Sequence, residues 1–399
     1  MKTLVAHALA IASALVLVAC GIVGNGKPAD PPAGGITAVP RDGSVIVSWV
    51  PEDGVDYWLD YAASSALTSQ NVRDLPAGTI VPHVASPKVV QGLTNGTTYY
   101  FTINGRKDGG PGGSDAPVVA ATPRPAGNSW TVGPAAGTND LRGVAFGSQF
   151  ISVGANGVMF SSPDGATLTA LPFVVASDLN AVAYNGSPAL YIAVGAAGAV
   201  LTSGDGQNWQ IQNSGITNNL SGVTSNGSGF IVAVGANGTL ITSSGGASWT
   251  ALSSGTTENL NAVAYGNGRL VAVGAAGVLL TSTDGTTWQL AASGSSLALN
   301  GITFGANQFV AVGAAGTVVT STDGVTWTPQ TAIGPGNLSA VAYGTQFVAV
   351  GSGGSVFTST DGITWTARSS GTGSVLNAVA SGNKGYSAVG AAGTNLTAY

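Results

Sequence analysis

Histidine and cysteine, which carry much of the acid–base, nucleophilic and metal chemistry of proteins, are almost missing from this sequence. The chain contains two histidines, His7 and His83, and one cysteine, Cys20. None of them lies in residues 128–399, which excludes from that stretch histidine-based catalysis, a Ser-His-Asp triad and most zinc sites. We expect His83 to be a surface or strand-edge residue, and we predict no metal site and no cofactor.

Carboxylates are the remaining candidates for chemistry in residues 128–399. Eight are present, and three of them, Asp140, Asp178 and Glu258, lie outside a repeated turn motif. A glycosidase needs two carboxylates facing each other across one bond, roughly 5 to 10 Å apart. Asp140 and Asp178 hold the same position in adjacent repeats, so a hydrolase or lyase that acts on glycans remains an alternative.

Cys20 ends an apolar N-terminal segment that follows the basic residue Lys2. The apolar stretch has about 15 residues, fewer than the roughly 20 that span a bilayer. Its last four residues are Leu17-Val18-Ala19-Cys20. Because the chain has no second cysteine, an intramolecular disulfide is impossible and the thiol is available for another bond.

The segment Leu17-Val18-Ala19-Cys20 resembles the lipobox of bacterial lipoproteins. The resemblance implies that residues 1–19 are a cleaved signal peptide and that Cys20 carries long acyl chains such as palmitate, which anchor the protein in a membrane. Gly21, in place of Asp, resembles the pattern of lipoproteins sent to the outer membrane. Residues 20–32 are rich in Gly and Pro and predict a flexible tether. The alternative is an ordinary secretory signal with an incidental cysteine.

The composition indicates the elements that must position any site. Of the 399 residues, 44% are apolar, 7% are charged and 61 are glycine. Low charge argues against disorder, the absence of a glycine at every third position excludes collagen, and 12 basic against 17 acidic residues argue against a nucleic-acid partner. Many short strands joined by tight turns are the expected structure.

Residues 33–123 alternate between apolar and polar residues, as in short strands. Residues 44–49 and 57–61 follow this period of two, and a further strand precedes Pro123. The spacing from Leu93 to Tyr99 is typical of a tyrosine corner, in which the hydroxyl bonds to nearby backbone. With an early core tryptophan, Trp49, these features resemble a fibronectin type III domain, which implies a β-sandwich that acts more often as a spacer than as a recognition site.

Residues 128–399 repeat one unit of about 39 residues. A strand beginning Leu141-Arg142-Gly143-Val144 recurs at Leu179, Leu220, Leu260, Leu299, Leu338 and Leu376, with spacings of 38, 41, 40, 39, 39 and 38. Each unit continues with Val-Gly-x-x-Gly, and most units then have a Ser-x-Asp-Gly turn and a tryptophan strand, although Leu168 replaces the tryptophan in the first unit. A full unit therefore has four strands, the size of a β-propeller blade. The last unit stops before its fourth strand, and Ser129-Trp130-Thr131 supplies the missing sequence. The prediction is therefore an all-β chain: a fibronectin type III-like sandwich followed by a seven-bladed β-propeller closed by an N-terminal strand.

The turn motif explains five of the eight acids. The aspartate accepts backbone N–H bonds, the glycine tolerates positive φ, and the tryptophan covers the turn. These units resemble the Asp-box (BNR-like) propellers, and the adjacent Asp and Gly resemble the photosystem II assembly-factor group, which weakens any transfer of sialidase activity. The turn aspartates are Asp164, Asp205, Asp284, Asp323 and Asp361, with Gly245 in the third unit.

Polar residues flank the repeat leucine and form the candidate ligand-binding face. Three arginines, Arg142, Arg269 and Arg368, fall at different places in their units and are not expected to converge. A ring of uncharged polar groups could bind a glycan or a peptide, or could merely cap the inner strands. The candidate ligand-binding residues are Asp140, Arg142, Asp178, Asn180, Asn219, Asn259, Asn261, Asn300, Asn337 and Asn377.

Together these features predict a lipid-anchored protein of the bacterial cell envelope, in the outer membrane, that presents a non-catalytic propeller to a glycan or protein partner. Two alternatives remain: the glycan-active hydrolase or lyase, and a purely structural envelope component without a discrete ligand.

Overall fold

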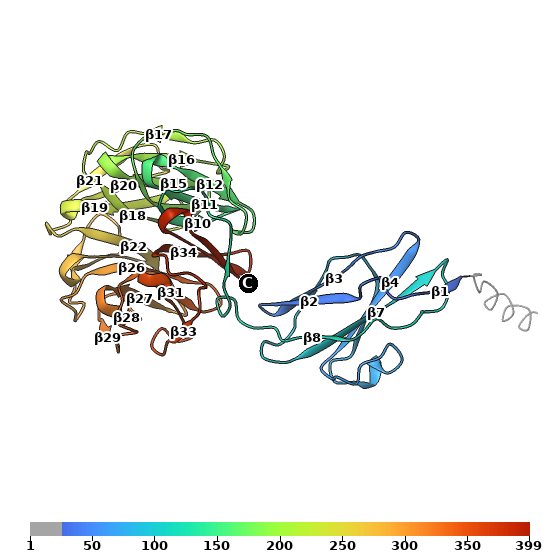
Figure 1. Ribbon diagram of the computed structural model, residues 1–399. Coiled ribbons are helices and arrows are strands. Elements are labelled where there is room, and N and C mark those ends of the chain that lie inside the picture. The colour runs from blue at the N-terminus through green and yellow to red at the C-terminus, as the bar shows by residue number, and fades with distance from the viewer. Residues whose placement is uncertain (1–25) are drawn as a thin grey trace, which may run out of the picture. The chain divides into compact units, whose positions relative to one another are not determined.

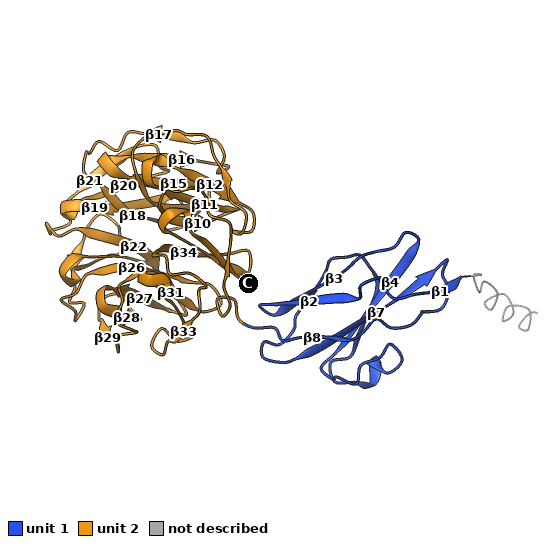
Figure 2. Ribbon diagram, viewed as in Figure 1, with its two compact units in different colours: residues 1–124 blue, residues 125–399 orange. Residues whose placement is uncertain are grey.

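The structure is a computed structural model that describes residues 26–399. The chain divides into two compact units, which we call the N-terminal unit (Met1–Arg124) and the repeat unit (Pro125–Tyr399) (Figures 1 and 2). Regular structure is almost entirely antiparallel β-strand, so the all-β prediction is confirmed. In the described part of the chain no helix is long and apolar enough to cross a membrane. The signal peptide and Cys20 lie outside the described residues.

Two sheets form the N-terminal unit. The larger sheet has the order β1-β7-β4-β5, with β8 added to β7, and the smaller has the order β2-β3-β6. The elements are β1 (Lys27–Ala29), β2 (Ile36–Arg41), β3 (Ser44–Trp49), β4 (Val55–Ala62), the 3-10 turn η1 (Val72–Asp74), β5 (Thr79–Val84), β6 (Lys88–Gln91), β7 (Tyr99–Lys107) and β8 (Val119–Ala121).

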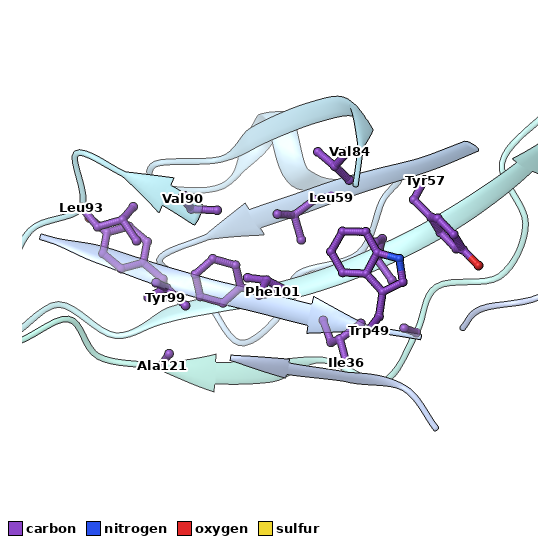
Figure 3. Close-up of a cluster of buried hydrophobic side chains, with 14 residues drawn as sticks. Ile36, Trp49, Tyr57, Leu59, Val84, Val90, Leu93, Tyr99, Phe101 and Ala121 are labelled. Atoms are coloured by element: carbon purple, nitrogen blue, oxygen red, sulfur yellow. The ribbon is translucent and has the colours of Figure 1, made fainter. Parts of the chain in front are cut away.

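Alternate side chains of these strands form the larger of two buried apolar clusters in this unit (Figure 3). Trp49 packs edge-on against Tyr57, with ring centroids 5.7 Å apart. The Tyr99 hydroxyl accepts a hydrogen bond from the Thr94 backbone N–H at 3.2 Å, which is the bond expected of a tyrosine corner. The fibronectin type III resemblance itself remains a prediction.

The N-terminal unit differs from the sequence expectation in one segment. Lys27–Ala29, inside the expected tether, forms β1 and pairs with β7. Backbone hydrogen bonds at a sheet edge need no apolar period, so a Gly- and Pro-rich sequence does not exclude such a strand. His83 is exposed, as expected, and its Nδ1 lies 2.9 Å from Asp56 Oδ2.

The repeat unit has a propeller-like fold made of four-stranded antiparallel sheets. Within the described chain the first sheet is β10 (Leu141–Phe146), β11 (Phe150–Gly154), β12 (Met159–Ser162) and β13 (Thr169–Ala170), and the second is β14 (Leu179–Gly186), β15 (Ala189–Gly195), β16 (Val200–Ser203) and β17 (Gln210–Gln212). The third is β18 (Leu220–Ser225), β19 (Phe230–Gly235), β20 (Leu240–Ser244) and β21 (Trp249–Leu252), and the fourth is β22 (Leu260–Gly266), β23 (Arg269–Gly274), β24 (Leu279–Ser282) and β25 (Gln289–Leu290). The fifth is β26 (Leu299–Gly305), β27 (Gln308–Gly313), β28 (Val318–Ser321) and β29 (Thr328–Pro329), and the sixth is β30 (Leu338–Tyr343), β31 (Phe347–Gly351), β32 (Val356–Ser359) and β33 (Thr366–Arg368).

The last sheet joins the two ends of the repeat unit. It consists of β34 (Leu376–Gly382), β35 (Gly385–Gly390), β36 (Asn395–Ala398) and β9 (Thr131–Val132), where Leu396 pairs with Val132. The first strands of neighbouring sheets contact one another, and β10 contacts β34, so they form a closed ring. Apolar residues of adjacent sheets pack together in successive core clusters around this ring.

Each Val-Gly-x-x-Gly segment forms a tight 3-10 turn between the second and third strands. Asn156 and Asn237 have φ of 56° and 55°, the left-handed geometry expected for them, but alanine takes the same geometry in four other turns. The seven turns are η2 (Ala155–Gly157), η3 (Ala196–Gly198), η4 (Ala236–Gly238), η5 (Ala275–Gly277), η6 (Ala314–Gly316), η7 (Ser352–Gly354) and η8 (Ala391–Gly393).

Candidate functional site

The residues that follow the repeat leucines line one cavity of about 200 Å³, which we call the central cavity. In each first strand the register shifts at this residue, so that it forms a β-bulge; Leu141 pairs with Gly154, whereas Gly143 pairs with Val153. A bulge re-aims the side chain of the extra residue. The cavity is thereby ringed by Arg142, Asn180, Ser221, Asn261, Asn300, Ser339 and Asn377.

Four asparagines of this ring tie neighbouring sheets together. The Asn180 Nδ2 donates to the Leu220 carbonyl at 2.8 Å, and the Asn377 Nδ2 donates to the Leu141 carbonyl at 2.8 Å, across the closure of the ring. Asn261 and Asn300 make the same bond to the leucine of the next sheet. These amides therefore have a structural role. The N–H and oxygen groups that these bonds do not use can still form hydrogen bonds with a molecule in the cavity.

Arg142 is the one arginine of the repeat unit that lines the central cavity. Its Nη1 donates to Asp178 Oδ2 at 2.8 Å and to Asn180 Oδ1 at 3.0 Å. Arg269 and Arg368 instead donate to threonine hydroxyls of their own sheets. The three guanidinium groups thus do not gather around one anion.

The residues before the repeat leucines do not line the central cavity. Asp178 Oδ1 accepts the Asn156 N–H at 2.8 Å, and Asp140 Oδ1 accepts the Ala392 N–H at 2.9 Å; both donors lie in the left-handed turn of the preceding sheet. Two units have Ala298 and Val375 at this position, which cannot accept such a bond. In the other three units an asparagine Oδ1 accepts the equivalent turn N–H: Asn219 from Ala197, Asn259 from Asn237 and Asn337 from Ala315.

Of the three candidate catalytic acids, Asp140 and Asp178 share one setting, in which each accepts a turn N–H, whereas Glu258 lies in another. The Asn156 N–H and the Arg142 guanidinium lower the pKa of Asp178, which disfavours a role as general acid at neutral pH. Glu258 is exposed and borders a separate, open depression of about 750 Å³ together with Asn218 and Asn237. Among the residues that the structure describes, no group of three or more His, Cys, Asp or Glu could hold a metal ion.

The turn aspartates hold the hairpins between third and fourth strands. Asp323 Oδ1 accepts backbone N–H bonds from Val325 and Thr326, each at 2.8 Å, and these bonds with that from the Ser321 hydroxyl lower its pKa to about 2. In the third sheet Gly245 stands in place of aspartate and adopts φ of 89°. The same pattern recurs at Asp164, Asp205, Asp284 and Asp361.

The sequence identified which residues lie near the cavity but not what their side chains bind. The bulge after each repeat leucine and the bonds between sheets were missed. One signal was present in five of the seven units: an Asp or Asn stands before the leucine, and the left-handed residue of the preceding unit's turn is Asn or Ala. Ala298, which follows the turn of Ala276, is the exception. Cys20, the lipid-attachment residue expected from the sequence, is outside the described residues.

Comparisons with known proteins support the propeller. The family described as the DUF6242 beta propeller domain matches residues 222–335. A solved structure titled "YCF48 bound to D1 peptide" superposes with a TM-score of 0.57 and 18% identity, covering 69% of this chain and 98% of the other. The structure of YCF48 from Cyanidioschyzon merolae gives a TM-score of 0.55 and 19% identity over 68% of this chain and 98% of that one. No curated protein matches the chain. At these identities the likeness concerns the fold.

Proposed function

We propose that this chain is a lipid-anchored envelope protein whose repeat unit, a seven-bladed propeller closed by its N-terminal strand, binds a protein partner and serves as an assembly scaffold. The observation that carries the proposal is the central cavity, ringed by neutral amides and hydroxyls with one guanidinium, Arg142. Such groups recognise peptide carbonyls and amides by hydrogen bonds and offer no general acid. The solved propeller of similar fold that is bound to a D1 peptide supports a protein rather than a glycan as partner.

In this proposal the N-terminal unit is a fibronectin type III-like spacer and Cys20 carries the anchor in the outer membrane. Metabolic labelling with palmitate tests the anchor. We expect the wild-type chain to be labelled and the Cys20→Ala variant to lose the label. Label that persists in Cys20→Ala would show that Cys20 is not the lipid-attachment residue.

Site-specific photo-crosslinking tests the binding face. A photoreactive residue at Ser339, in the central cavity, should trap a defined envelope protein, whereas the same residue at Thr286, beside an Asp-Gly turn, should not. The Arg142→Gln change should weaken this crosslink. Equal crosslinking from both positions, or none from Ser339 together with binding on a glycan array, would contradict a protein-binding cavity.

A purely structural role is the second candidate, and one observation favours it. Four side-chain amides of the ring donate to backbone carbonyls of the neighbouring sheet, so their presence is explained by folding without any ligand. They belong to Asn180, Asn261, Asn300 and Asn377. Under this candidate, alanine at Ser221 and Ser339, for which the structure shows no such bond, would leave every envelope interaction unchanged. Under the binding proposal, the double variant weakens the crosslinked complex.

A further inference from the structure

A polar pocket lies on the outer face of the larger sheet in the N-terminal unit. Its volume is about 350 Å³, within the usual range for small-molecule sites. Adjacent strands β4 and β7 supply the floor, where Trp58 pairs with Asn104 and Asp60 pairs with Thr102. Two connecting segments wall the pocket: residues 69–73, around η1, and residues 112–113, before β8.

Two polar side chains of this floor are buried without enough partners. Asp60 and Asn104 are each only 2% exposed, yet Asp60 Oδ1 and Asn104 Oδ1 have no hydrogen-bond partner. The one bond between them, from Asn104 Nδ2 to Asp60 Oδ2, is long at 3.4 Å. A buried acceptor without a hydrogen-bond donor destabilises the folded state. The folded chain supplies no donor to either oxygen, so a ligand that supplies one would be stabilising.

The surroundings of Asp60 add both negative and positive charge. Asp115 is close enough to act on Asp60 electrostatically, and its own Oδ1 has no partner either. The Arg106 Cζ lies over the Trp58 ring, 3.6 Å from its centroid, and the buried Nη1 has no acceptor. Arg73 is exposed at the rim. The pocket therefore holds oxygens that lack donors, at Asp60 and Asn104, and a guanidinium that lacks an acceptor, at Arg106.

We propose that this pocket binds an α-amino acid, with the ammonium group at Asp60 and Asn104 and the carboxylate at Arg106 and Arg73. An ammonium group carries three donors and no acceptor, which matches the unpartnered oxygens. A guanidinium pairs with a carboxylate in a planar, charge-assisted geometry. The adjacent Arg106 disfavours a bare metal ion, and calcium needs six to eight oxygen ligands. This site goes beyond the function proposed for the repeat unit, since it lies in the other unit.

The protonation of Asp60 fits this assignment. Burial and the nearby Asp115 raise the pKa of Asp60 to about 7, despite the opposing charge of Arg106. Without a bound cation in the pocket, the carboxyl group is thus driven toward its neutral form. An ammonium group at Asp60 favours the carboxylate.

Isothermal titration of the full chain at pH 8 tests the proposal with glycine, L-alanine, D-alanine and L-lysine as probes. We expect at least one of them to saturate a single site. N-acetyl-L-alanine, which lacks the ammonium group, and ethylamine, which lacks the carboxylate, should bind at least tenfold more weakly. Calcium chloride and methyl α-glucoside serve as alternative ligands. Saturation by either of them in place of the amino acids, or no binding by any amino acid, would overturn the proposal.

Two variants locate the site. Asp60→Asn keeps the shape of the side chain and removes its charge, and it should weaken amino-acid binding at least tenfold. The matched control Asp53→Asn changes an exposed aspartate between β3 and β4 and should bind like the wild type. Arg106→Gln tests the carboxylate end separately and should cause a similar loss. Unchanged affinity in both Asp60→Asn and Arg106→Gln would show that binding occurs elsewhere.

Discussion

The two units of this chain use aspartate in opposite ways. In the repeat unit the turn aspartates are surrounded by backbone N–H donors, and Asp323 has a pKa of about 2. In the N-terminal unit Asp60 is buried with an unpartnered oxygen, and its pKa is raised to about 7. The cause differs: backbone N–H donors lower the pKa of Asp323, whereas burial and then the charge of Asp115 raise that of Asp60. Carboxylates with enough donors hold the fold, whereas the unpartnered oxygen of Asp60 belongs to the proposed ligand site.

The largest expected effect is on the pH dependence of the N-terminal unit. Because the folded pKa of Asp60, about 7, exceeds the unfolded value of about 3.9, the folded state binds more protons between these values. This contribution to stability is therefore complete below about pH 4 and is lost as pH rises through 7. At pH 8, Asp60→Asn should raise the melting temperature of this unit by at least about 4 °C.

Scanning calorimetry of the full chain between pH 4.5 and 8 measures this change, with Asp53→Asn as the control. The wild type and the control should lose stability as pH rises, and Asp60→Asn should lose less. Parallel pH profiles for the wild type and Asp60→Asn would remove the proposed contrast between the units.

A smaller effect of opposite sign is expected in the repeat unit. The folded pKa of Asp323 is below its unfolded value, so its stabilisation is present above about pH 4 and is lost as pH falls toward 2. By analogy with a helix N-cap, Asp323→Ala should lower the free energy of unfolding by about 1 kcal/mol at pH 7. Urea denaturation of the wild type and of Asp323→Ala measures this difference in the free energy of unfolding.

The control for this experiment is Asp323→Asn, which keeps an oxygen acceptor in the turn but cannot ionise. It should retain part of the stability at pH 7 without the loss on acidification. If Asp323→Ala and the wild type differ equally at pH 7 and pH 2, charge-assisted bonding by the aspartate is not the cause.

The smallest effect concerns the bonds between sheets. Asn337 caps the Ala315 N–H, whereas Ala298, at the same position one unit earlier, leaves the Ala276 turn without this cap. Asn337→Ala should lower the free energy of unfolding by about 0.5 kcal/mol, and Ala298→Asn should raise it by a similar amount, as for weak side-chain caps. Chemical denaturation of both variants checks the opposite signs. A loss of stability in Ala298→Asn would mean that the cap geometry does not carry over between units.

Local patterns predicted the hairpins well. The strand expected at residues 44–49 is β3 with the same limits, and β9 pairs with β36 where the interrupted repeat required it. A strand such as β3 depends on alternation and turn residues a few positions apart, whereas the β9–β36 pairing was predicted from the repeat that is incomplete at residue 399. The left-handed alanines, such as Ala315, were not predictable from residue preference because alanine is unfavourable there. The Ala315 turn is held in part by the side chain of Asn337, which lies just before the first strand of the next sheet.

The sequence by itself determined the repeat period, the turn chemistry and the four strands of each unit, because these rest on interactions within about 40 residues. Only the tertiary structure decided which polar groups have partners. Asn180 is engaged by a leucine carbonyl of the next sheet, whereas Asp60, in an ordinary alternating strand, is covered by segments from two other parts of the chain. Hydrogen-bond partners and burial come from segments distant in sequence, so residue type alone does not reveal whether a polar side chain is structural or free for a ligand.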